Sequence, residues 1–83
     1  MTWDKSVEIK FKEIIAKIPI FMRDIAEKKV LRRIEKILSE GTRSIVTEKD
    51  MIDAFFKETP FGFHGPMKTD MDLLGIDYKK YGY

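Results

Sequence analysis

Apolar residues recur at helical spacing over the first two thirds of the chain. A stripe with steps of three and four residues is typical of a helix that buries one face. One stripe runs from Asp4 to Ile18 and a second from Ile20 to Glu40, which predicts a short and then a long amphipathic helix. Their apolar positions are Val7, Phe11, Ile14, Ile15 and Ile18, followed by Ala26, Val30, Ile34, Ile37 and Leu38.

Residues that start and stop helices mark the ends of both segments. Asp4 is a suitable N-cap for the first helix. Pro19 disfavours helical backbone in the residue before it and can open a new turn, so we expect a corner at Ile18-Pro19. Gly41 is expected to end the second helix in the left-handed conformation. Ile45 to Thr47 then predict a brief extended segment.

A third, short helix is predicted after Thr47, which acts as its N-cap. Asp50 takes the place of the usual Glu in a capping-box variant, and the helix has to end before Pro60. The expected fold class is therefore all-α, a small three-helix domain of residues 1–60 with an extension of residues 61–83. The apolar face of this third helix consists of Met51, Ile52, Phe55 and Phe56.

After Pro60 the chain is rich in aromatic residues, glycine and proline and has no helical period. Residues 61–66 predict an ordered loop, and Thr69 is expected to cap a short turn that ends at Gly75. We therefore expect an irregular aromatic tail, which either folds back over the core or docks on another protein. The residues assigned to partner contact are Phe61, Phe63, His64, Tyr78, Tyr81 and Tyr83.

Composition excludes several classes of protein. The 83 residues suffice for one domain, and no internal repeat is evident. Cysteine is absent, which excludes disulfides, thiolate catalysis and iron–sulfur ligation. There is no secretory signal pattern and no apolar run near the roughly 20 residues of a membrane span, so we expect a cytoplasmic protein without a membrane partner.

Five cations fall on one face of the long helix, and this basic face consists of Lys28, Lys29, Arg32, Arg33 and Lys36. Such a face can contact phosphates or an acidic protein surface. In the alternative interpretation it is solvated and paired with neighbouring carboxylates of Asp24, Glu27 and Glu35. A net charge of +2 does not by itself indicate nucleic acid.

Candidate chemistry is sparse. His64 is the only histidine, and it suits either a hydrogen bond that holds the loop or, less readily, a haem or metal ligand. No second metal-ligating residue lies at a typical spacing from His64 in the sequence. Phosphate loops, nucleophile elbows and paired-carboxylate motifs are also absent. We therefore expect a non-catalytic protein without a cofactor or metal.

The order Trp3, Ile18-Pro19-x-Phe21-x-Arg23, Ile34-Glu35, Gly41, Ile45-Val46-Thr47 resembles the small C-terminal domain of the B subunit of light-independent protochlorophyllide reductase. In that family the reaction belongs to a larger iron–sulfur body, and the helical domain is an appendage. Trp3 and Arg23 match the family's motif, and we expect Trp3 to pack on the second helix and Arg23 to bond carbonyls at the end of the first. The bulky Leu38 and the extension of residues 61–83 depart from the family pattern. The residues given structural roles are Trp3, Pro19, Phe21, Arg23, Gly41 and Thr47.

Three functions follow as expectations. The first is an accessory subunit of a larger cytosolic, anaerobic or redox enzyme, bound through the aromatic tail and the basic face. The second is a nucleic-acid-binding module, since the order of short helix, long helix, extended segment and helix is also similar to half of a histone fold. The third is a tetrapyrrole or haem binder through His64. The oligomeric state stays open.

Overall fold

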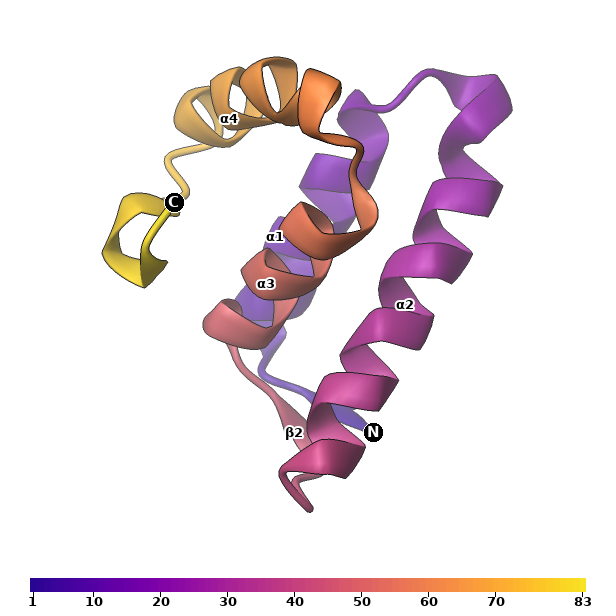
Figure 1. The fold of residues 1–83 in the computed structure, drawn as a ribbon, viewed down its shortest axis with the longest axis vertical. Coiled ribbons are helices and arrows are strands. Elements are labelled where there is room, and N and C mark those ends of the chain that lie inside the picture. Colours follow the sequence, from indigo (N-terminus) through magenta and orange to yellow (C-terminus); the bar gives the residue numbers. More distant parts are fainter.

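The computed structural model describes all 83 residues and confirms the all-α fold class (Figure 1). Besides four α-helices the chain has three short 3-10 helices and two two-residue strands that pair in parallel. The helices are α1 (Lys5–Lys17), α2 (Arg23–Glu40), α3 (Glu48–Glu58) and α4 (His64–Leu73). The remaining elements are β1 (Thr2–Trp3), η1 (Ile20–Met22), β2 (Ile45–Val46), η2 (Phe61–Phe63) and η3 (Lys79–Tyr81).

The helices pack around one core. α2 lies along α3, α4 runs across one end of the molecule where it contacts α1, and the C-terminal segment returns beside α3 (Figure 1). Ile34, Met51, Ile52 and Met71 are the largest side chains that are fully buried. Because Met71 lies in α4, the segment after residue 60 shares its core with the segment before it.

The first helix forms as predicted. The carboxylate of Asp4 accepts a hydrogen bond from the backbone N–H of Ser6 (2.9 Å), and Ile18 leaves the helix in an extended conformation (φ −75°, ψ 139°). The chain then makes the 3-10 turn η1 before α2 begins. α2 therefore starts at Arg23 and not at Ile20.

The end of α2 differs from the prediction at Gly41. Gly41 has φ −95°, and the left-handed residue is Thr42 (φ 51°). The N–H of Arg43 donates to the carbonyl of Leu38 (2.9 Å) and that of Thr42 to Ser39 (3.2 Å). These two bonds make a Schellman motif with threonine at the position where glycine is usual.

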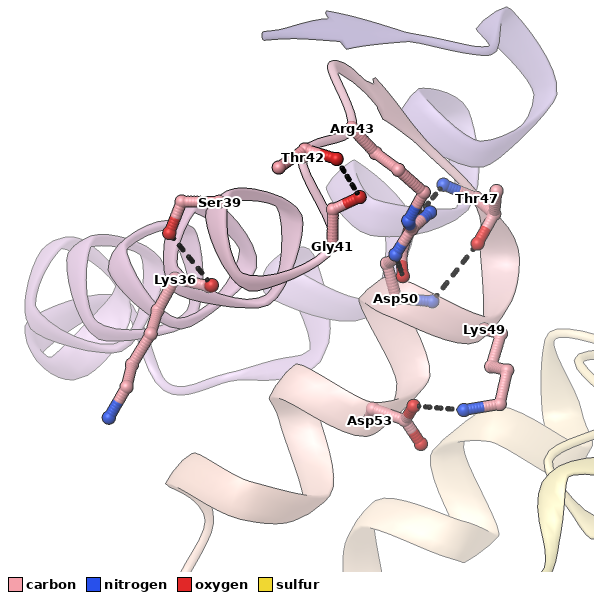
Figure 2. A network of polar contacts seen from close by, with 9 residues as sticks. All are labelled: Lys36, Ser39, Gly41, Thr42, Arg43, Thr47, Lys49, Asp50 and Asp53. Atoms are coloured by element: carbon pink, nitrogen blue, oxygen red, sulfur yellow. Dashed lines mark hydrogen bonds and ion pairs between the residues drawn. The ribbon is translucent and has the colours of Figure 1, made fainter.

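The link from α2 to α3 is fixed by polar contacts (Figure 2). Thr47 and Asp50 form the predicted capping box. The guanidinium of Arg43 also holds the Asp50 carboxylate through two nitrogens, at 2.9 and 2.5 Å. Burial alone would raise the pKa of Asp50, which is 3 % exposed, but hydrogen bonds from Arg43 and Thr47 hold that pKa below its ordinary value.

The predicted extended segment is β2, and its partner is β1 at the N-terminus. Thr2 pairs with Ile45 and Trp3 with Val46. The Trp3 ring contacts Phe11 of α1 (centroids 5.0 Å apart) and packs against the core.

The prediction of an irregular tail is wrong between His64 and Leu73, where α4 forms. Met67 and Met71 stand one turn apart and turn their side chains into the core. Thr69 lies inside this helix and its hydroxyl donates to the carbonyl of Gly65 (3.2 Å), so it is not a cap. The tail folds back over the core.

Candidate functional site

Two corners of the chain share one backbone conformation. Pro19 has φ −51° and ψ 137°, and Pro60 has φ −54° and ψ 142°. The N–H of Met22 donates to Pro19 (2.9 Å), and that of Phe63 donates to Pro60 (2.8 Å). Each corner follows a strand and a helix and leads into another helix. The structure therefore contains a repeat that the sequence analysis missed.

The side chain that follows each 3-10 turn ties the corner together. In the first corner, Nε of Arg23 donates to the carbonyl of Ile18 (2.8 Å) and Nη2 donates to that of Ala16 (2.7 Å). The expected role of Arg23 as a donor to the end of the first helix is confirmed.

His64 takes the same place in the second corner. Its Nε2 lies 2.8 Å from the carbonyl oxygen of Thr59 and 3.2 Å from that of Phe56. A carbonyl oxygen only accepts, so Nε2 carries the proton and donates. Both Arg23 and His64 thus bond the carbonyl of the residue before the proline, and the loop-holding interpretation of His64 describes what the ring does here.

The corners leave large apolar side chains exposed. Ten such side chains are exposed in the whole chain; five of them lie in the two corners, and a sixth, Ile25, lies in the first turn of α2. Phe21 is 81 % exposed and Phe61 87 %. Phe21 therefore adds nothing to the core, contrary to the structural role expected for it. We call Ile20, Phe21, Met22, Ile25, Phe61 and Phe63 the corner surface.

Both corners lie at the same end of the long axis of the molecule (Figure 1). Large apolar side chains that gather at one end of a molecule and stay in water are typical of a binding surface. The corner surface is the strongest candidate for an interaction site in this chain.

The basic face begins next to this surface on α2. Lys29, Arg32 and Lys36 follow Ile25 at steps of four, seven and eleven residues, so all four share the outward face of the helix. Of the five cations of the basic face, only Arg33 forms an ion pair, with Glu58 of α3 (2.7 Å). The pairs expected with Asp24, Glu27 and Glu35 are absent.

The three tyrosines assigned to partner contact are engaged within the chain. Tyr78 is 5 % exposed, and its hydroxyl lies 3.3 Å from a carboxylate oxygen of Asp72. The hydroxyl of Tyr81 donates to Glu48 (2.9 Å). These contacts belong to the tail as it covers the core.

Of the three tyrosines, Tyr83 makes the shortest hydrogen bond to a carboxylate. Its ring stacks on Phe56, and its hydroxyl donates to Asp53 (2.6 Å). Burial and the Asp53 carboxylate together raise the pKa of Tyr83 to about 12.

The carboxylate of Glu48, at the start of α3, is contacted by three side chains. Lys10 pairs with one of its oxygens, and Tyr81 and Lys80 (3.3 Å) contact the other. Burial raises the pKa of Glu48, but these donors outweigh burial and lower it. The cluster joins α1, α3 and the tail and leaves no oxygen of Glu48 free for a ligand.

Only part of the corner surface is predictable from the sequence. Phe61 and Phe63 are among the residues that the aromatic tail assigns to partner contact, whereas Ile20, Met22 and Ile25 are not. One signal was available for Ile25, because nine residues separate it from Ile34 and nine residues are about 2.5 helical turns. The two isoleucines must face opposite directions, so one of them had to be exposed.

No group of three or more His, Asp or Glu side chains that could hold a metal ion occurs in the structure. None of the helices combines the length and the apolar composition needed to cross a membrane. Comparison of the chain with protein-family models, with curated proteins and with solved structures finds no match.

Proposed function

We propose that this chain is a non-catalytic accessory protein that docks on a larger cytosolic protein complex through the corner surface, with the basic face as a second contact. One observation carries the proposal: two corners of matching geometry expose large apolar side chains at the same end of the molecule. Exposed aromatic and aliphatic side chains on a rigid support are favoured anchors in protein interfaces.

The neighbouring charges indicate the chemistry of the partner. Lys28, Lys29, Arg32 and Lys36 have no intramolecular ion pair and flank the corner surface along α2. A complementary surface would offer an apolar pocket for Phe21 and Phe61, bordered by carboxylates. The resemblance to the reductase appendage supports an enzyme complex as the bearer of that surface.

The test is an oxygen-free affinity purification from the native host, followed by identification and purification of the stoichiometric partner. Deleting the tail is unsuitable because it removes Met71 and Tyr78 from the core. The variant is instead Phe21→Ser with Phe61→Ser. Leu73→Ser is the matched control, because Leu73 is 72 % exposed but lies outside both corners.

With the purified partner, the double variant should raise Kd at least about tenfold, while the control leaves Kd unchanged. Binding should weaken only modestly between about 50 and 500 mM salt because apolar anchors dominate. A partner that binds the double variant as tightly as the parent would overturn the proposal. So would a corner surface that serves only to pair two copies of this chain.

A nucleic-acid-binding function is the second candidate, and the unpaired cations of α2 favour it. Its signature is different. Affinity for single-stranded or duplex DNA should fall steeply with salt, in proportion to the phosphates neutralised, and should be insensitive to Phe21→Ser. No observation favours a haem carrier, since Nε2 of His64 already donates to two carbonyls.

A further inference from the structure

A shallow cavity lies between the outer side of α2 and the end of α3. Its volume is about 220 Å³, and no apolar residue lines it. Four of its five lining residues are cations and the fifth is a carboxylate, so the local charge is strongly positive. The lining residues are Lys29, Arg32, Arg33, Lys36 and Glu58.

One of the cations is held in place. Nε of Arg33 donates to Glu58 (2.7 Å), and the two side chains are 30 % and 23 % exposed. The terminal nitrogens of Arg33 make no other hydrogen bond. This pair therefore orients a guanidinium at the wall of the cavity and leaves donors of the kind that bind phosphate oxygens in pairs.

The cations also repel one another. Lys29 and Lys36 are seven residues apart, which is about 10 Å along a helix, and the other two stand between them. Among the four only Arg33 has an acidic partner. A doubly charged anion in the cavity would relieve this repulsion and satisfy several donors at once.

We propose that this cavity binds a phosphate monoester group. The cluster is compact, and the carboxylate of Glu58 closes it on one side. A compact group with two negative charges suits it better than a long run of singly charged diesters. The proposal does not rest on the corner surface, because phosphate can bind whether or not that surface docks on a protein.

The test is a titration of the isolated chain with inorganic phosphate, followed through backbone amide NMR signals at constant ionic strength set with chloride. Signals of residues 29–36 and of Glu58 should shift and saturate. Arg32→Gln with Lys36→Gln should weaken binding at least about tenfold, the cost of losing charge-assisted hydrogen bonds. Lys12→Gln with Lys17→Gln is the matched control on α1, with the same change in net charge and no change in affinity.

Glu58→Gln gives a readout that a purely structural role would not move. The amide oxygen of the new side chain still accepts the hydrogen bond from Arg33, but the substitution removes the negative charge. Phosphate should therefore bind about threefold more tightly. Shifts that depend only on ionic strength, or equal losses in the test and control variants, would overturn the proposal and mark an adventitious ion only.

Two further titrations show which kind of molecule carries the phosphate group. A short phosphoserine peptide that binds more tightly than inorganic phosphate points to a phosphorylated protein, whereas glucose 6-phosphate binding more tightly than the peptide points to a metabolite. Either result supports the site. An oligonucleotide whose affinity grows with its length and exceeds both would contradict it, since that behaviour belongs to an extended nucleic-acid surface.

Discussion

The ring of Tyr83, the last residue, stacks on the ring of Phe56 with centroids 4.0 Å apart and planes only 4° from parallel. Phe56 also contacts the ring of Tyr78 and, nearly at a right angle, the ring of His64, so one buried ring of α3 joins the tail to the second corner. The aromatic tail is thus part of what holds the corner surface in shape.

Tyr83→Ala should destabilise the fold by about 2–4 kcal/mol, the sum of a lost aromatic pair and a lost hydrogen bond to a charged group. Tyr83→Phe keeps the stack and loses only the bond to Asp53, so its cost should be the smaller of the two. Urea unfolding followed by circular dichroism measures both. Equal stability of Tyr83→Ala and the parent would show that the tail is not fastened by this contact.

Alkaline pH should weaken the fold through the same residue. The pKa of Tyr83 is raised to about 12, mainly by burial, whereas an unfolded tyrosine titrates near about 10. The protonated phenol is favoured in the folded state, so its contribution is complete below about pH 10 and is lost as pH rises through about 12. The parent should therefore lose more free energy of unfolding over this range than Tyr83→Phe, in which Tyr78 and Tyr81 still titrate.

Arg43→Gln should destabilise the fold, because it leaves the nearly buried carboxylate of Asp50 without its cation. The pKa of Asp50 is lowered in the fold, so this contribution is present above the ordinary pKa of about 4 and disappears as pH falls through the folded value. Lys49→Gln is the control, since Lys49 is 62 % exposed in its pair with Asp53 and should contribute under about 1 kcal/mol. Similar losses at neutral pH would contradict the account.

Ile34→Asp should abolish cooperative thermal unfolding, because Ile34 is 0 % exposed and an unpaired charge would enter a small core. Ile25→Asp places the same charge on the opposite face of α2, where Ile25 is 63 % exposed, and should change stability by less than about 0.5 kcal/mol. Cooperative melting of Ile34→Asp would mean that the buried face of α2 is wrongly assigned.

Local interactions, both hydrogen bonds and the backbone restriction at proline, explain which elements could be predicted from the sequence. The effects of Asp4, Pro19 and the Thr47–Asp50 pair reach only a few residues along the chain, so the sequence alone predicts them. α4 was missed because Gly65 and Pro66 suggested a loop. Pro66 is the third residue of this helix, where the absent N–H would have no partner within the helix in any case.

The features that could not be predicted from the sequence depend on contacts between residues far apart in the chain. The left-handed Thr42 lies next to Arg43, whose bond to Asp50 joins α2 to α3. The pairing of Trp3 with Val46 spans half the chain. To predict the corner surface, one has to know which apolar side chains the rest of the molecule leaves exposed. Helical spacing alone gives this information only for Ile25.

Site-specific photo-crosslinking in the native host tests whether the corner surface binds a larger protein. A benzophenone amino acid replaces Phe21 or Phe61 in the corner surface, or Ile45 as the control, which is 57 % exposed on β2. We expect an adduct with the same larger protein from positions 21 and 61 and none from position 45. Equal adducts from all three positions, or adducts only with copies of this chain, would contradict docking through the corner surface.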